Sequence, residues 1–170
     1  RIKTPAGQCL EYFRGRIYVG SRRVLWFSDA FRYFRLDPRR NFKQFPDDID
    51  LIAAAHDGSG LYVAAGGITY FLEGQNPHKF ELRSVAGYGA YRGTRKEVLR
   101  SKIGENKNAE DDHDVCLWTS HEGVVAGLPN GALKNLTIEK YIMPVGLSAA
   151  SFINTNVNNE GFAQYITSIK

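Results

Sequence analysis

A strand-pair pattern occurs twice in the chain, at 16–30 and at 60–74, with no gap between the aligned residues. In both copies a run of β-branched and aromatic residues precedes a short turn and a second such run, which is typical of a β-hairpin. Gly66 and Gly67 supply the turn of the second copy, because glycine tolerates the positive φ that tight hairpins need. In the first copy the turn positions are occupied by Arg22 and Arg23, which suit a tight turn less well than glycine. The aligned pairs are Ile17/Leu61, Tyr18/Tyr62, Val19/Val63, Val24/Ile68, Trp26/Tyr70 and Phe27/Phe71.

More strands of this kind are predicted around the two copies. The apolar run 50–56 closes on a Gly-containing turn, and 80–85 alternates between apolar and polar residues. A third, weaker copy pairs 115–120 with 124–127 across a turn at 121–123. Four short strands in each period of about 40–50 residues are the pattern of β-propeller blades.

We therefore expect an all-β protein of antiparallel hairpin repeats that resembles a β-propeller. It would be a single β-rich domain over 1–170, with three blade-like units at approximately 1–49, 50–93 and 115–170. The interval 94–114 is charged and poor in apolar residues, so it predicts a long surface loop with a helical turn near 95–101.

The last part of the chain continues the strand pattern. Residues 135–142 alternate, and strands are predicted at 151–153 and 161–169, joined by an Asn-rich turn over 154–160.

Three blades are too few to close a ring, which takes about four or more. The chain starts at Arg1 and has one methionine, Met143, so we expect a partial propeller or a fragment. Because each hairpin has a face that it cannot cover alone, missing blades or partner subunits would complete the ring. No apolar run approaches the roughly 20 residues that span a membrane, and no membrane span is expected.

The two cysteines, Cys9 and Cys116, lack the C-x-x-C spacing of metal or redox motifs. Both fit the strand pattern, which favours buried free thiols, and a single long-range disulfide is the alternative. The formal net charge of +4 is uneven: residues 1–50 carry 11 Lys and Arg against 6 Asp and Glu, whereas 101–170 carry 5 against 8. The basic part either contacts an acidic partner or solvates a surface.

Arginines interleave with aromatic residues over 12–45. Proteins that bind single-stranded nucleic acid combine these groups, and protein interfaces are enriched in them as well. In strands, the aromatics can also fill the core. The candidate interaction surface consists of Arg14, Arg22, Arg23, Arg32, Arg35, Arg39 and Arg40.

No motif with a clear chemical role is found. The acidic run 111–114 lacks the spacing of a calcium loop, and His56 with Asp57 lies in a turn without a recognisable nucleophile. The glycines of 86–94 miss the spacing of a phosphate-binding loop, and neither His78 nor His121 has ligand spacing. We therefore expect no catalytic residue, no cofactor and no metal ligand set.

Short motifs through most of the chain resemble those of tail-associated virion proteins of tailed phages and prophages, the propeller-like hub or DNA-stabilisation type. They are Pro5-Ala-Gly-Gln8, Glu11-Tyr-Phe-Arg-Gly-Arg-Ile-Tyr-Val19, Leu25-Trp-Phe-Ser-Asp29, Asn41-Phe-Lys-Gln-Phe-Pro46, Asp57-Gly-Ser-Gly-Leu-Tyr-Val63, Thr69-Tyr-Phe-Leu-Glu-Gly74, Arg92-Gly-Thr94, Trp118-Thr-Ser120, Gly123-Val-Val-Ala-Gly127 and Gly161-Phe-Ala-Gln-Tyr-Ile166.

This resemblance implies a structural subunit of the virion, made in the cytoplasm of the bacterial host, in the tail hub or connector. Other virion proteins, further copies of the chain and DNA are the implied partners, and no small-molecule substrate is expected. Two alternatives stay open: a propeller-type carbohydrate-acting enzyme or carbohydrate-binding module, and a nucleic-acid-binding surface of Arg and aromatic residues.

Overall fold

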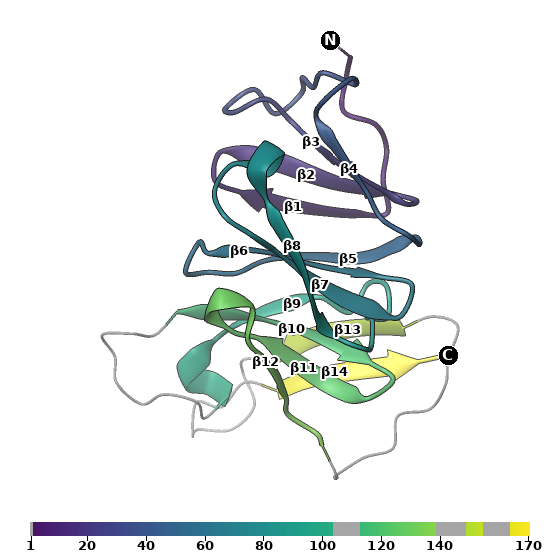
Figure 1. Cartoon of the computed structure of the whole chain (residues 1–170). Coiled ribbons are helices and arrows are strands. Elements are labelled where there is room, and N and C mark those ends of the chain that lie inside the picture. The colour runs from purple at the N-terminus through teal and green to yellow at the C-terminus, as the bar shows by residue number, and fades with distance from the viewer. Residues whose placement is uncertain (1, 104–112, 139–148, 155–163) are drawn as a thin grey trace.

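The computed structural model describes residues 2–103, 113–138, 149–154 and 164–170. Three four-stranded antiparallel sheets and one two-stranded sheet lie in a stack (Figure 1). The expected all-β class with antiparallel sheets is confirmed. Among the described residues, no helix is long and apolar enough to cross a membrane.

Each of the three larger sheets is a meander in which consecutive strands are neighbours. The first contains β1 (Cys9–Phe13), β2 (Arg16–Ser21), β3 (Val24–Phe27) and β4 (Phe42–Gln44). The second contains β5 (Ile49–Ala54), β6 (Gly60–Ala65), β7 (Ile68–Glu73) and β8 (Glu81–Ala86), with the 3-10 helix η1 (Pro77–Lys79) before β8. The third contains β9 (Lys96–Leu99), β10 (Asp114–Ser120), β11 (Gly123–Gly127) and β12 (Leu133–Asn135), with η2 (Arg100–Ile103) and η4 (Pro129–Gly131) between strands.

The predicted hairpins are the two central strands of each sheet. Tyr18 pairs with Phe27 across β2 and β3, and Tyr62 pairs with Phe71 across β6 and β7, so both copies have the same register. The third copy is the hairpin of β10 and β11, which also has a two-residue turn. The pattern could be predicted because alternation and turn residues are both local in the sequence.

The interval 94–114 differs from the expected long surface loop. It contains β9, which pairs with β10, and the 3-10 helix η2; residues 104–112 lie outside the described residues. A strand forms here because Val98 is buried opposite Val115, while its neighbours Glu97 and Leu99 are exposed. A single buried residue gives an edge strand too weak an apolar pattern to be recognised.

The tail of the chain forms the fourth sheet, a hairpin of β13 (Ala149–Asn154) and β14 (Gln164–Ile169). The expected strands at 151–153 and 161–169 fall on these two, although 161–163 and most of the Asn-rich turn, 155–160, lie outside the described residues. The strand expected over 135–142 is shorter, since β12 ends at Asn135, a turn follows to Ile138, and 139–142 are also outside the described part.

Apolar side chains fill the space between successive sheets. Tyr18 and Phe27 of the first sheet pack against Leu61 and Val63 of the second. Tyr62 and Phe71 then pack against Trp118 and its neighbours in the third sheet. A smaller layer of Val98, Val115, Leu117 and Ala126 faces Ile153 and Tyr165 of the terminal hairpin. Successive sheets are therefore held together by burial of the apolar faces that they turn toward each other.

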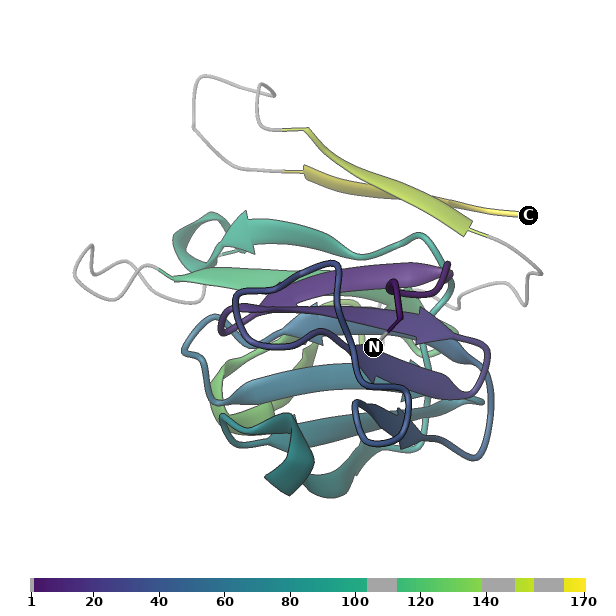
Figure 2. The same ribbon diagram turned by 90° about the horizontal axis from the view of Figure 1, so that it is seen from above.

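The first strands of the sheets gather along one side of the stack. β1 contacts β5, and β13 contacts β9. In the view from above, β1, β9 and the terminal hairpin lie toward the same side (Figure 2). This side brings together residues that are far apart in the sequence.

Candidate functional site

A polar cluster lies where the first strands of the three larger sheets meet. Glu11 of β1 accepts hydrogen bonds from the backbone N–H groups of Tyr12, at 2.9 Å, and of Ala54, at 3.1 Å. Arg95, immediately before β9, places Nη2 2.5 Å from Oε2 of Glu11 and also pairs with Glu97. One guanidinium therefore joins a carboxylate of the first sheet to one of the third.

The Glu11 side chain is only 8% exposed, and its environment sets its protonation. Burial raises the pKa of the Glu11 carboxyl, while the charge of Arg95 and the backbone donors act in the opposite direction. The pKa of Glu11 is raised overall because burial is the largest of these influences.

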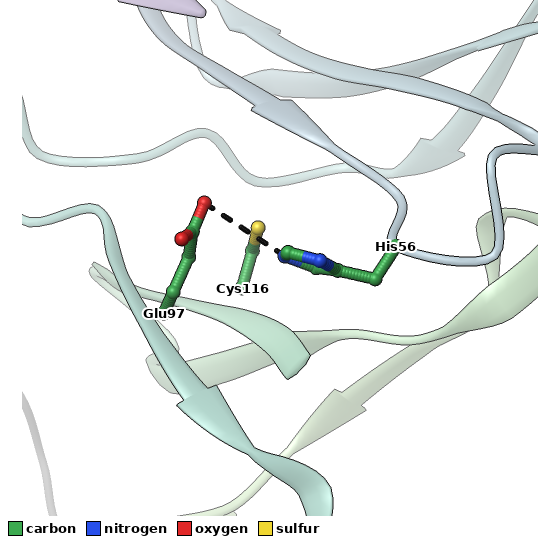
Figure 3. Close-up of side chains that lie close together, drawn as sticks. All are labelled: His56, Glu97 and Cys116. Carbon is green, nitrogen blue, oxygen red and sulfur yellow. Dashed lines mark ion pairs between the residues drawn. The ribbon is translucent and has the colours of Figure 1, made fainter. Parts of the chain in front are cut away.

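Three residues with metal-binding atoms converge beside this cluster (Figure 3). Cys116 of β10 lies directly opposite Glu97 of β9, so the two side chains share one face of the sheet. His56 reaches them from the turn that follows β5. One ligand atom from each residue lies within 4.8 Å of the others, and Nε2 of His56 is 3.7 Å from Oε1 of Glu97. Nitrogen, carboxylate oxygen and sulfur are the donors that Zn²⁺ prefers.

Cys116 is the rigid member of this group. It is fully buried, and its thiol donates to the carbonyl oxygen of Ala54 at 3.2 Å. Burial raises the pKa of Cys116 to about 12, although the nearby charge of Arg95 acts against the rise. The thiol is therefore protonated near neutral pH unless a cation displaces the proton.

A hollow of about 460 Å³ opens next to the two clusters. Its lining includes Glu11, His56, Asp57 and Glu97, together with other residues of β1, the β1–β2 turn, the end of β5 and the β5–β6 turn. A small ligand or several water molecules would fit between these polar side chains.

The sequence gives no direct signal for this site. His56 was predicted as a turn residue and Cys116 as a buried free thiol, and both are so placed, but Glu97 was assigned to a surface loop. Recognition of β9 as a strand would have placed Glu97 opposite Cys116. His56 joins them only through the stacking of the second sheet on the third, which has no local pattern.

The seven predicted arginines lie at the two ends of the first sheet. Arg14 lies in the β1–β2 turn, where Nε donates to the carbonyl oxygen of Gly58 at 2.9 Å. Arg22 and Arg23 lie at the opposite end of the sheet, and Arg23 is 3.6 Å from Asp47. The remaining four, Arg32, Arg35, Arg39 and Arg40, lie in the connection between β3 and β4.

Among the residues that the structure describes, the most exposed aromatic side chains lie in the β3–β4 connection. Phe31 is 76% exposed and Phe34 is 81% exposed, and both alternate with the exposed Arg32 and Arg35. The expected combination of Arg and aromatic groups is therefore present at the surface over 31–35, whereas aromatics such as Tyr18 and Phe27 fill the core.

One face of the first sheet is apolar and has no sheet over it, although the segment before β1 covers part of it and buries Val19. Leu10 and Tyr12 are 62% and 51% exposed, and Phe42, at 41%, contacts Trp26 on the same face. An apolar hollow of about 510 Å³ lies over it, between the segment before β1 and the β3–β4 connection. Exposed apolar patches of this kind mark contact sites in soluble proteins.

The other sequence candidates have structural explanations or fall outside the described residues. Within the acidic run, 111 and 112 are outside, His113 is exposed, and Asp114 begins β10. His78, in η1, packs edge-on against Phe27 at the end of β3. The Gly-containing stretch 86–94 links β8 to β9. Cys9 is a half-buried free thiol, with its pKa raised by burial to about 11.

Comparison with models of known protein families gives no match, and neither does comparison with curated proteins.

Proposed function

We propose that the chain is a structural subunit of a phage or prophage virion, in the tail hub or connector. Its sheets would act as blades of a propeller-like ring around the DNA channel, completed by further subunits. The motifs that resemble tail-associated virion proteins give the proposal its class. The observation that supports assembly is the exposed apolar part of the first sheet's outer face, at Leu10, Tyr12 and Phe42.

The repeat itself indicates that this face is built to be covered. Leu10 pairs with Val19 across β1 and β2, as Ile52 pairs with Val63 across β5 and β6. Ile52 is 1% exposed because the first sheet lies on it, whereas Leu10 is 62% exposed. A further sheet stacked on the first would bury Leu10 as the first sheet buries Ile52.

The driving force for such stacking is the burial of large apolar side chains, each worth about 1.5–3 kcal/mol. At the other end of the stack, the terminal hairpin exposes Phe152 and Ile166, which pair across β13 and β14. A head-to-tail contact between these two ends joins different surfaces of two copies, and such contacts produce rings when the rotation closes.

Leu10→Asp is the variant that tests assembly, because it places a charge on the exposed apolar face at β1, the edge strand of the first sheet. We expect the wild type to sediment as a multimer and Leu10→Asp to sediment as a monomer. Leu82→Asp is the matched control, since Leu82 is 45% exposed on β8 of the second sheet. A wild type that sediments as a monomer, or a control that dissociates equally, would count against assembly through this face.

The virion assignment has a separate test. Particles purified from the lysed host should contain the chain in a fixed ratio to the tail proteins, measured by mass spectrometry. Intact tailed particles that lack the chain would refute this part of the proposal, whatever its oligomeric state.

A second candidate function is contact with single-stranded nucleic acid through 31–35. The observation that favours it is the alternation of exposed Phe31 and Phe34 with exposed Arg32 and Arg35. Aromatic faces stack on bases while guanidinium groups contact phosphates. In a ring around DNA, this segment would lie either at the channel or at a subunit contact.

A further inference from the structure

We propose that His56, Glu97 and Cys116 bind one divalent transition-metal ion, with zinc the best fit, beside the hollow and where the β5–β6 turn meets β9 and β10. The proposal does not depend on the virion assignment, because all three ligands belong to one chain. It rests on the convergence of the three side chains in Figure 3 and on the chemistry of their donor atoms.

The three ligand atoms need to move only slightly closer together to bind one metal ion. Tetrahedral zinc with bonds of about 2.0–2.3 Å places its ligand atoms about 3.3–3.6 Å apart. The three atoms here lie within 4.8 Å, and His56 Nε2 is already 3.7 Å from Glu97 Oε1. The side chains of His56 and Glu97 are 26% and 41% exposed, so they can rotate toward the fixed Cys116 thiol.

The donor set selects the class of metal. A thiolate and an imidazole favour zinc and related transition metals, whereas calcium and magnesium take oxygen ligands. Three protein ligands leave one tetrahedral position, and His56 and Glu97 both line the adjoining hollow. Water or a ligand carboxylate would occupy that fourth position, as in zinc sites that keep an open coordination place.

The charges around the site match a divalent ion. Metal binding converts the Cys116 thiol to a thiolate and releases its proton to solvent. The thiolate then joins the carboxylates of Glu11 and Glu97. The guanidinium of Arg95 contacts both carboxylates, so the four groups together carry two negative charges. Arg95 and Glu11 would also orient Glu97, the role that outer-shell partners have in metal sites. Without a metal, the same contacts form an ion-pair network, and this is the competing interpretation.

Cobalt is the probe that tests the proposal, because Co²⁺ occupies zinc sites and reports a bound thiolate by a near-ultraviolet charge-transfer band. Metal-free wild-type protein is titrated with Co²⁺, followed by displacement with Zn²⁺. We expect one equivalent to bind with this band and with the visible absorption of tetrahedral cobalt, and zinc to abolish both.

The variants identify the ligands. Cys116→Ser should remove the charge-transfer band, and His56→Gln and Glu97→Gln should each weaken binding about tenfold or more. Cys9→Ser and His121→Gln are the matched controls, since Cys9 is the other thiol and His121 is an exposed turn histidine paired with Glu122. Neither control should change binding.

Three results would overturn the proposal. They are the absence of saturable Co²⁺ binding by folded wild type, loss of the band in Cys9→Ser, and unchanged affinity in both His56→Gln and Glu97→Gln. His56→Gln and Glu97→Gln alter partly exposed side chains, so these two variants remain informative if Cys116→Ser fails to fold.

Discussion

The repeat places two tyrosines at equivalent positions with opposite hydrogen-bonding states. Tyr18 and Tyr62 are both fully buried. The hydroxyl of Tyr62 lies 2.5 Å from the carbonyl oxygen of Leu128 and 2.7 Å from that of Ala132, so it ties the second sheet to the β11–β12 connection. The hydroxyl of Tyr18 has no hydrogen-bond partner among the described residues. Removal of each hydroxyl should therefore change stability in opposite directions.

The magnitudes follow from the buried groups. Tyr62→Phe loses a buried hydrogen bond, so we expect a loss of about 1–2 kcal/mol in the free energy of unfolding. Tyr18→Phe deletes a buried polar group that is unpaired, which costs the wild type about 1–3 kcal/mol, and the ring keeps its contacts with Phe13, Phe27 and Phe80. A small void offsets part of this gain, so we expect no loss and up to about 1 kcal/mol of added stability.

Urea unfolding followed by far-ultraviolet circular dichroism measures both variants against the wild type. The slope of the free energy of unfolding against urea concentration should stay unchanged, because neither variant alters the surface exposed on unfolding. In thermal unfolding, a difference of about 2 kcal/mol between the free energies of unfolding of the two variants would separate their melting temperatures by roughly 4–8 °C for a chain of this size. If Tyr18→Phe is destabilised as much as Tyr62→Phe, the assignment of an unpaired Tyr18 hydroxyl is wrong.

Two further predictions concern the β6–β7 turn and the β3–β4 connection. In urea unfolding, Gly66→Ala should lower the free energy of unfolding by about 2–4 kcal/mol and Gly67→Ala by about 1–2 kcal/mol. Both glycines have a positive φ, but only a Cβ on Gly66 would meet Asp47, at 2.3 Å. Equal losses in the two variants would contradict this explanation. Arg32→Glu with Arg35→Glu should weaken binding to single-stranded DNA and reduce the salt slope by about 0.7 for each lost phosphate contact. Fluorescence anisotropy over a salt series measures both effects, and Arg22→Glu with Arg23→Glu, at the opposite end of the sheet, should have neither.

The sequence was sufficient where structure depends on neighbours along the chain. The hairpins of β2–β3 and β6–β7 combine alternating apolar residues with a short turn, so their position and register follow from local patterns. The weaker copy at β10–β11 was recognised by comparison with the first two. β9 was missed because Val98 is its only buried residue, and its pairing with β10 depends on the rest of the third sheet.

The candidate site could not be predicted from the sequence, for a different reason. Glu97, His56 and Cys116 each look ordinary in sequence, since a charged edge strand, a turn histidine and a buried thiol all have structural explanations. Their proximity arises from the stacking of three sheets, which is a long-range property. The exposure of 31–35 was equally hidden, because aromatic residues near strands are more often in the core.

The polar cluster explains how apolar sheets can stack in one defined arrangement. Apolar burial is non-directional, so the layers alone would tolerate sliding of one sheet over another. Glu11 of the first sheet accepts a hydrogen bond from Ala54 of the second and contacts Arg95 at the start of the third, so one carboxylate is bonded to three sheets. Hydrogen bonds and ion pairs need specific distances, and a shift of any sheet would leave this buried carboxylate unpaired. The cluster therefore contributes to the register of the stack, together with the hydrogen bonds from Tyr62 to the β11–β12 connection, and the same register brings His56 to Glu97 and Cys116.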